Sequence, residues 1–181
     1  SSVLHREVRR TSRTGNSLSL LFIDLDNFDA VNDSHGHLCG SRALVEAAQV
    51  IQRSARETDI VARFGGDEFV VVLPETGNEG ARVVAERVRE NLAKHRFLTT
   101  AGFEVRLTAS IGSAALPEAA STADELLRAA DYAMYGVKAQ GKNGILVAGK
   151  ASGLGRRPSG RLSMNRSSRD QSRTVSKGAN C

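Results

Sequence analysis

The sequence has few cysteines and no long apolar run, and these absences exclude several classes of protein. Its two cysteines, Cys39 and Cys181, lie far apart and make no disulfide framework, so a reducing cytoplasm is the expected setting. No stretch approaches the roughly 20 apolar residues that a membrane-spanning helix needs, and the polar start of the chain is unlike a signal peptide. We therefore expect a soluble chain, or a soluble fragment of a longer one, without membrane insertion.

Aromatic residues are also scarce: tryptophan is absent, and residues 150–181 contain no aromatic side chain. This segment holds eight of the 25 lysines and arginines but only one of the 20 acids, so the net charge of +5 belongs to it and residues 1–149 are slightly acidic. Rich in Ser, Gly and Arg, it cannot bury enough surface to offset its ordering entropy. We expect a solvated, disordered tail, and without rings for stacking we expect no nucleic-acid partner.

The rest of the chain predicts one α/β domain at residues 17–149, preceded by the end of a linker helix at residues 1–16. The apolar run at residues 17–23 predicts a buried strand. Further strands are expected at 59–64, 67–73, 103–115 and 145–147, and helices at 26–34 (ending near Gly36), 41–55, 77–95 and 122–139, the last with Thr122 as its N-cap. This order predicts helices packed on a mixed sheet.

Carboxylates occur at two places that would be neighbours in such a sheet. Asp-Leu-Asp at residues 24–26 ends the first strand, and Asp67 and Glu68 follow the Gly-Gly turn expected at residues 65–66. Converging carboxylates suit a hard cation such as Mg²⁺, and two such ions can clamp the oxygens of a phosphoryl transfer. Judged by spacing alone, a solvated hairpin tip with ordinary turn acids is the alternative.

Four motifs in order resemble the GGDEF family of cyclic-dinucleotide synthases, the diguanylate cyclases, over residues 18–147. They are FIDLDNFDAVNDSHGH at 22–37, RFGGDEFVVVLPET at 63–76, TASIGSA at 108–114 and ADYAMYGVKAQGKN at 130–143. The resemblance implies a mostly antiparallel central sheet, similar to polymerase palms and class III adenylyl cyclases. It also implies an enzyme that joins two nucleoside triphosphates into a 3′,5′-cyclic dinucleotide and releases pyrophosphate.

The resemblance assigns the metal and catalytic residues. It implies metal-binding carboxylates at Asp24 and Asp67, with the backbone carbonyl of Leu25 as a further ligand. Glu68 matches the catalytic acid, which binds metal or helps to deprotonate the 3′-hydroxyl. The implied cofactor is Mg²⁺ or Mn²⁺, two ions per active site.

The phosphate-binding residues follow from the same resemblance. The amides of Phe28 and Asp29 lie at a helix N-terminus, which suits phosphate. Lys138 and Lys142 match the cations that hold the terminal phosphates. The family usually has Arg where Lys142 stands, so the charge is kept and bidentate geometry is lost. Asp29 stands where many members have Lys, and an acid there should not help phosphate binding.

The base-recognition residues depart from the family pattern. Asn32 is kept, but Ser41 replaces the Asp of the family's GHxxGD motif. A carboxylate accepts the N–H donors of guanine, whereas a serine hydroxyl donates or accepts and tolerates either purine. Losing the carboxylate should remove much of the discrimination against adenine.

The swap at Ser41 resembles the hybrid promiscuous ("Hypr") subclass, which uses ATP as well as GTP and makes cyclic GMP–AMP alongside cyclic di-GMP. A strictly GTP-specific diguanylate cyclase is one alternative. A domain that has lost activity and acts as a cyclic-dinucleotide receptor is another, but such domains usually have a degraded signature hairpin, which is complete here.

An inhibitory product site and a dimer are also implied. The RxxD motif formed by Arg56 and Asp59, together with Arg87 on the following helix, matches the site where the family binds its cyclic dinucleotide. A surface ion pair is the alternative. The chemistry needs two facing domains, each with one triphosphate, and so implies a homodimer.

Overall fold

A run of apolar residues forms the central strand of the sheet. β1 (Leu18–Leu25) is buried at every position, in agreement with its continuous apolar sequence. The computed structural model describes residues 2–149, and the tail expected at 150–181 lies outside the described residues. Within this range the strands form one sheet in the order β2-β3-β1-β4-β5, where β2 is Ile60–Gly65, β3 is Glu68–Pro74, β4 is Ala109–Leu116 and β5 is Ile145–Val147. β4 and β5 are parallel and the other pairs are antiparallel, so the expected mixed, mostly antiparallel sheet is confirmed.

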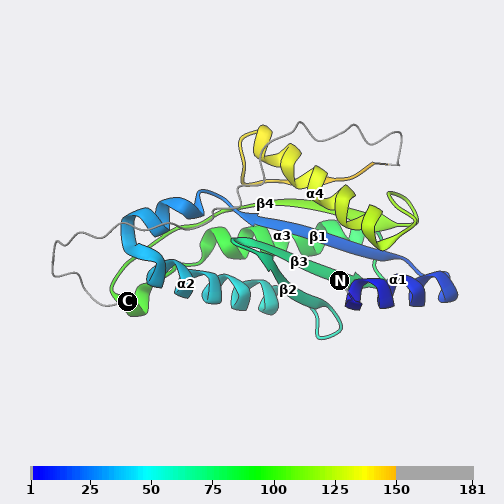
Figure 1. Ribbon diagram of the computed structural model, residues 1–181, viewed down its shortest axis with the longest axis horizontal. Helices are drawn as coiled ribbons and strands as arrows, with labels where there is room; N and C mark the ends of the chain where they lie inside the picture. The colour runs from blue at the N-terminus through cyan, green and yellow to red at the C-terminus, as the bar shows by residue number, and fades with distance from the viewer. Residues whose placement is uncertain (1, 150–181) are drawn as a thin grey trace, which may run out of the picture.

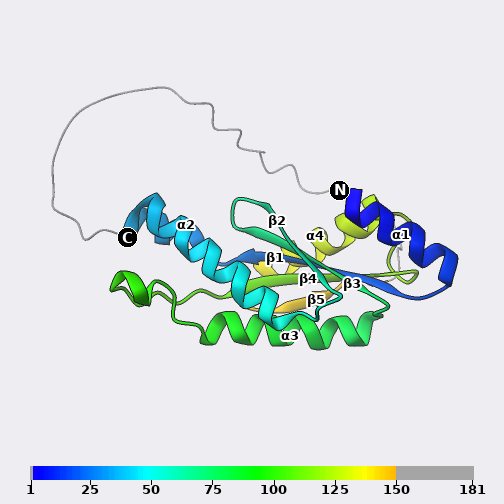
Figure 2. The ribbon, with the colours of Figure 1, turned by 90° about the horizontal axis from the view of Figure 1, so that it is seen from below.

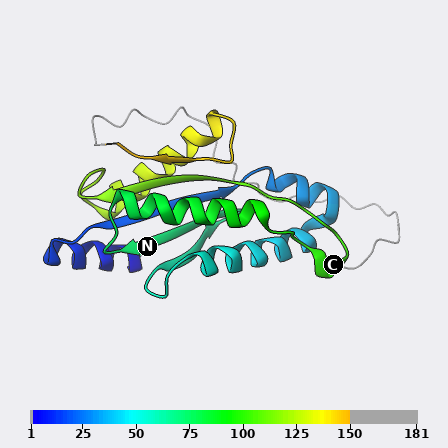
Figure 3. The ribbon, with the colours of Figure 1, turned by 180° about the vertical axis from the view of Figure 1, so that it is seen from behind.

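Helices cover both faces of this sheet; they are α1 (Ser2–Thr14), α2 (Phe28–Ser54), α3 (Asn78–Lys94) and α4 (Ala123–Ala139). Successive side chains of β1 point to opposite faces of the sheet. Leu21 and Ile23 join the core under α2 and α3, whereas Leu20 and Phe22 join the core under α4 and α1. Figures 1 and 2 show α3 and α4 on opposite sides of the sheet, and Figure 3 shows α2 and α3 from behind. Each buried Leu or Ile contributes about 1.5–3 kcal/mol to stability.

One long helix, α2, follows β1 where two helices were expected. Gly36 is its one residue with non-helical backbone angles, at φ 82° and ψ 162°. The expected interruption near Gly36 is confirmed, and glycine suits it because a positive φ costs other residues energy. The second part of the helix resumes directly after Gly36, so the predicted start near residue 41 is wrong. Ser41 therefore lies within the helix.

The strand expected at residues 103–115 is wrong over its first half, because β4 begins at Ala109. Before it, Val105 and Phe97 exchange backbone hydrogen bonds of 2.9 and 3.1 Å, beside a short 3₁₀ helix at Thr99–Ala101. The ring of Phe103 packs on the ring of His35, with centroids 4.6 Å apart. The strand-like alternation of apolar residues here reflects side chains that cover one edge of the core.

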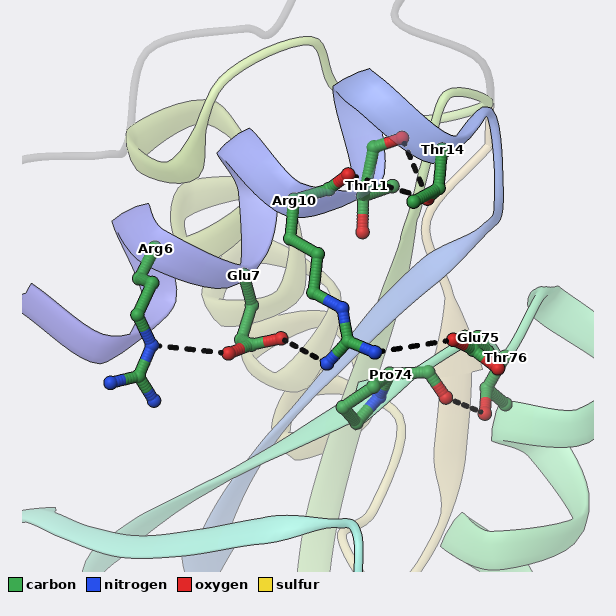
Figure 4. Close-up of polar contacts among 8 residues, drawn as sticks. All are labelled: Arg6, Glu7, Arg10, Thr11, Thr14, Pro74, Glu75 and Thr76. Atoms are coloured by element: carbon green, nitrogen blue, oxygen red, sulfur yellow. Dashed lines mark hydrogen bonds and ion pairs between the residues drawn. The ribbon is translucent and has the colours of Figure 1, made fainter.

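One ion pair, between Arg10 and Glu75, connects α1 to the end of β3, and Figure 4 shows it. The carboxylate of Glu7 is almost fully buried and lies 3.8 Å from the guanidinium of Arg10. Arg10 also lies 3.6 Å from Glu75, directly after β3, and Val8 packs into the core under α4. The residues expected as the end of a linker helix are thus helical and pack on the domain. None of the described helices is long and apolar enough to cross a membrane.

Candidate active site

The end of β1 and the β2–β3 hairpin meet at one end of the sheet. Asp24 is paired with Glu68 in the antiparallel register of β1 and β3. The backbone N–H of Leu25 donates to the carbonyl of Asp67 over 3.2 Å. The fold therefore brings together the three carboxylates that were predicted to bind metal and to act in catalysis.

The turn of this hairpin is displaced by one residue from the predicted Gly65–Gly66. Gly65 is paired with Glu68, so Gly66 and Asp67 form the turn. The register shifts between Arg63 and Gly65, and such an irregularity moves the turn along the chain. Gly66 has a φ of 51°, and its carbonyl accepts a 2.8 Å hydrogen bond from Nε of Arg63. Asp67 is consequently held at the tip of the hairpin.

A lysine from α4 lies against the first of the carboxylates. Nζ of Lys138 is 2.6 Å from Oδ2 of Asp24, whose side chain is 7% exposed. The other oxygen, Oδ1, is buried and accepts no hydrogen bond from the described residues. Burial raises the pKa of Asp24, the hydrogen bond from Lys138 opposes that effect, and the negative charge of Asp67 adds to it.

The other two carboxylates experience the same kind of environment. Burial is the largest cause that raises the pKa of Asp67, and it also raises the pKa of Glu68. The charge of Asp24 raises the pKa of Glu68 further, while Lys138 lowers it. The three acids are therefore partly buried and influence one another's charge, and one ammonium group, that of Lys138, contacts Asp24.

This cluster fits a hard divalent cation that keeps part of its coordination for substrate. Among residues 2–149, no group of three or more His, Cys, Asp or Glu side chains could hold a metal ion. Mg²⁺ is often bound through one or two carboxylates, with waters and substrate phosphates completing the shell. The oxygen-only donors of Asp24 and Asp67, and the unpartnered Oδ1 of Asp24, suit that mode of binding.

A cavity of about 250 Å³ adjoins Asp67 and is lined by residues from three of the predicted roles. Phe28 and Asp29, at the start of α2, were predicted to bind phosphate. Asn32 and Ser41 were predicted to bind the base, and Asp67 was predicted to bind metal. The cavity is lined by these five together with His37, Gly40, Leu44, Arg63 and Gly66.

Close packing within α2 shapes the part of the cavity that was predicted to bind the base. A Cβ atom on Gly40 would lie 1.9 Å from Oδ1 of Asn32, so a side chain at residue 40 would displace the amide. Ser41 is the next residue and its side chain is exposed. Because Gly40 has no side chain, Asn32 and Ser41, the pair predicted to bind the base, can both line this cavity.

The two predicted phosphate-binding lysines contact the end of β1 and the residue before α2. Lys138 contacts Asp24, as described above, and is one-third exposed. Nζ of Lys142 donates to Oδ1 of Asn27, the residue that precedes α2. Unpaired N–H groups and the helix dipole favour anions at a helix N-terminus, and the ammonium of Lys142 lies beside that of α2.

The predicted inhibitory residues also lie close together, at the opposite end of α2. The carboxylate of Asp59 is buried and accepts a 2.7 Å hydrogen bond from the backbone N–H of Arg56. Nε of Arg87, on α3, donates to the carbonyl of Ser54 over 2.8 Å. The side chain of Arg56 is exposed, so its guanidinium is open to solvent beside the turn that the hydrogen bond to Asp59 closes.

Sequence reasoning missed several residues that organise the site. Asp26 was noted as part of the Asp-Leu-Asp run without a role, yet its carboxylate accepts hydrogen bonds from Thr108 and Ser110, both of 2.7 Å. Arg63 lines the cavity and holds the hairpin turn. The side-chain oxygen of Asn27 accepts a hydrogen bond from Nζ of Lys142. The adjacency of Asp26 and Asn27 to the predicted site was the one available signal.

Comparison with known proteins identifies the family. Residues 1–144 match the family described as "Diguanylate cyclase, GGDEF domain". The GGDEF domain of YfiN (TpbB) from Pseudomonas aeruginosa is 38% identical, with a TM-score of 0.74 over 80% of this chain and 90% of that one. The chain therefore belongs to the GGDEF family of diguanylate cyclase domains, and the expected palm-like fold is confirmed.

Its full-length relatives are much longer. The response regulator PleD of Caulobacter vibrioides is 37% identical over 146 residues, which is 80% of this chain and 32% of PleD. The GGDEF domain of DgcB from Caulobacter crescentus, solved in complex with c-di-GMP, is 25% identical with a TM-score of 0.75, over 81% of this chain and 86% of that one. The chain spans about a third of PleD.

Proposed function

We propose that this domain condenses two purine nucleoside triphosphates into a 3′,5′-cyclic dinucleotide with release of pyrophosphate. The observation that carries the proposal is the meeting of Asp24, Asp67 and Glu68 beside a cavity that ends at the N-terminus of α2. Membership of the GGDEF family and the names of its relatives, several of them diguanylate cyclases, support GTP as substrate and cyclic di-GMP as product.

The residues divide the chemistry between them. The amides of Phe28 and Asp29 bind phosphate oxygens, and Lys138 leaves Asp24 to neutralise the terminal phosphates together with Lys142. Asp24, Asp67 and the carbonyl of Leu25 would hold two Mg²⁺ or Mn²⁺ ions. When bound, these ions neutralise phosphate charge and lower the pKa of the 3′-hydroxyl.

Glu68 is the proposed proton acceptor. Burial and the charge of Asp24 raise its pKa above that of an ordinary glutamate, which makes its carboxylate a stronger base. The 3′-hydroxyl loses its proton as its oxygen bonds to the α-phosphorus of the other nucleotide. The bond from that phosphorus to the bridging oxygen breaks, and pyrophosphate leaves. A second, equivalent step closes the ring.

Ser41 suggests that the base site accepts ATP as well as GTP, giving cyclic GMP–AMP of the 3′,3′ type beside cyclic di-GMP. Its hydroxyl either accepts from guanine or donates to adenine. The exposure of Ser41 on the cavity wall, one residue after Gly40, supports a role in base reading. A guanine-specific enzyme is the competing proposal, and it predicts no mixed product.

A homodimer and product inhibition complete the proposal. Each domain offers one triphosphate-binding cavity, so two domains must face each other for mutual attack. Arg56, Asp59 and Arg87 would bind the cyclic dinucleotide product, and the solved complex of the DgcB GGDEF domain with c-di-GMP supports such binding. A cytoplasmic location is proposed because both nucleoside triphosphates are available there.

Product analysis from mixed nucleotides tests the proposal. The protein is incubated with GTP, ATP and Mg²⁺, and the products are separated by chromatography and identified by mass, with E68Q as the matched control. We expect cyclic di-GMP and cyclic GMP–AMP from the wild type and neither from E68Q. Cyclic di-GMP alone would contradict promiscuity, and the absence of every cyclic dinucleotide would contradict condensation.

A further inference from the structure

Asp26 stands beside the reactive carboxylates but differs from them in its hydrogen bonding. It is 3% exposed. Oδ2 accepts from Oγ1 of Thr108 over 2.7 Å and from the backbone N–H of Asn143 over 2.9 Å, and Oδ1 accepts from Oγ of Ser110 over 2.7 Å. Both oxygens are thus engaged by protein donors, whereas Oδ1 of Asp24 has none. A carboxylate so occupied is suited to holding other groups in place.

The bond from Asn143 fixes an unusual loop. Residues 141–143 have successive φ values of 113°, 66° and 45°, and two of the three are not glycine. Left-handed backbone is unfavourable for Lys142, so the loop needs bonds from outside it. The N–H of Lys142 donates to the carbonyl of Val137 over 3.1 Å, and Arg89 donates to the side chain of Asn143 over 3.1 Å. The Asp26 carboxylate is the buried member of this set.

The same loop places a cation at the phosphate site. Nζ of Lys142 donates to Oδ1 of Asn27, which is next to Asp26 in the chain and directly before α2. Asp26 is therefore connected to both sides of this contact: it is joined by the peptide bond to Asn27, and by a hydrogen bond to Asn143, the residue after Lys142. Loss of that bond would free the loop that carries Lys142 while leaving α2 in place.

We propose that Asp26 is a positioning residue, whose carboxylate holds residues 141–143 so that the ammonium of Lys142 lies at the N-terminus of α2, against the triphosphate. Asp26 acts through Lys142 and is not itself a ligand of substrate. The inference rests on the proposed function, since it assumes that a nucleoside triphosphate binds at this end of the cavity.

A double-mutant cycle on nucleotide affinity tests it. The probe is 3′-deoxy-GTP with Mg²⁺, which cannot react because it lacks the nucleophile, and calorimetry gives its Kd. We expect Lys142→Met to raise Kd about tenfold, as for loss of a charge-assisted contact to phosphate. Asp26→Ala should raise it about fivefold to tenfold, and the double variant no further than Lys142→Met alone, because both changes remove one interaction.

Two further variants separate positioning from folding and from charge. Asp26→Ala leaves buried donors without an acceptor and costs stability. Asp26→Asn keeps an oxygen for Thr108 and Asn143 and turns its amide N–H to Ser110, so we expect its Kd within about twofold of the wild type. Asp33→Asn, an exposed acid on α2, is the charge-matched control and should leave Kd unchanged.

Hydrogen exchange at the Asn143 amide gives a readout that needs no nucleotide. We expect faster exchange there in Asp26→Ala and wild-type exchange in Asp26→Asn. Additive effects in the cycle, or an Asp26→Asn protein that folds but loses tenfold in affinity, would overturn the positioning role. If the wild type does not bind 3′-deoxy-GTP at all, the proposed function fails and this inference fails with it, whereas additivity with normal wild-type binding defeats the inference alone.

Discussion

The ammonium of Lys138 lies 2.6 Å from the carboxylate of Asp24, the residue predicted to bind metal. In this arrangement the ammonium group lies against the carboxylate that was predicted to bind a metal ion. Burial raises the pKa values of that carboxylate and of the two neighbouring acids, Asp67 and Glu68. Under the proposed function, substrate binding would exchange one set of ion pairs for another: Lys138 would pair with the phosphates, and Asp24 would be left to hold a divalent cation.

Lys138→Met should strengthen the binding of metal and weaken the binding of GTP. Without the competing ammonium, Mn²⁺ alone should bind several-fold more tightly, a gain on the order of 1 kcal/mol. The KM for GTP should rise about tenfold because a charged contact to phosphate is lost. Electron paramagnetic resonance measures free Mn²⁺, and Lys94→Met, at an exposed lysine on α3, is the control. Weaker Mn²⁺ binding by Lys138→Met would show that the lysine does not compete with the metal.

Glu68→Gln should abolish product formation and stabilise the metal-free domain at neutral pH. Because the pKa of Glu68 is raised in the folded state, the folded protein binds protons more readily than the unfolded chain. The free energy of unfolding therefore falls as pH rises from the ordinary glutamate pKa through the raised one, and stays lower above it. Removing this charge should raise the unfolding midpoint by about 2 °C.

Thermal unfolding in the presence of EDTA, from pH 4 to pH 8, measures that effect. The difference between Glu68→Gln and wild type should grow as pH rises and then level off. Glu57→Gln, at an exposed acid, serves as the control. A variant that is less stable than wild type at pH 8 would contradict the electrostatic description of the site.

Ser41→Asp should shift the product towards cyclic di-GMP. A carboxylate accepts from guanine and repels the N1 lone pair of adenine, so use of ATP should fall by about tenfold or more. The ratio of mixed to homogeneous product is measured by mass spectrometry from equal GTP and ATP. Ser34→Asp, an exposed position on the same helix, is the matched control. An unchanged ratio would remove Ser41 from base selection.

Arg56→Ala should weaken inhibition by cyclic di-GMP. The exposed guanidinium is the part of this motif free to pair with phosphate, and its loss should raise the inhibition constant about tenfold. Initial rates are measured against added cyclic di-GMP, with Arg53→Ala on the exposed last turn of α2 as the control. The buried Asp59 keeps the turn in shape in both variants. Equal inhibition of wild type and Arg56→Ala would mean that the product binds elsewhere.

The sequence predicted the parts of the fold and site that depend on local pattern. The apolar run of β1 and the two glycines between β2 and β3 led to the central strands. Thr122 caps α4 as expected, with its hydroxyl accepting from the N–H of Glu125. The acids at the end of β1 and after the hairpin turn do meet, because antiparallel pairing sets Asp24 opposite Glu68.

Features set by tertiary contacts were not predictable in this way. The alternation at residues 103–108 arises from packing on the edge of the core and not from a strand. The irregular register at Arg63–Gly65 moved the turn by one residue. The difference between Asp24 and Asp26 depends on donors from distant segments, Thr108 and Asn143, which no spacing rule identifies.

The most direct measurement is the stoichiometry of the reaction with GTP and Mg²⁺ alone. Pyrophosphate release and cyclic di-GMP are measured in the same samples over a series of protein concentrations. We predict two pyrophosphates for each cyclic di-GMP, a rate per domain that rises with concentration as dimers form, and neither product with Glu68→Gln. Pyrophosphate without cyclic di-GMP, or GTP that remains unchanged at every concentration, would contradict the proposed condensation.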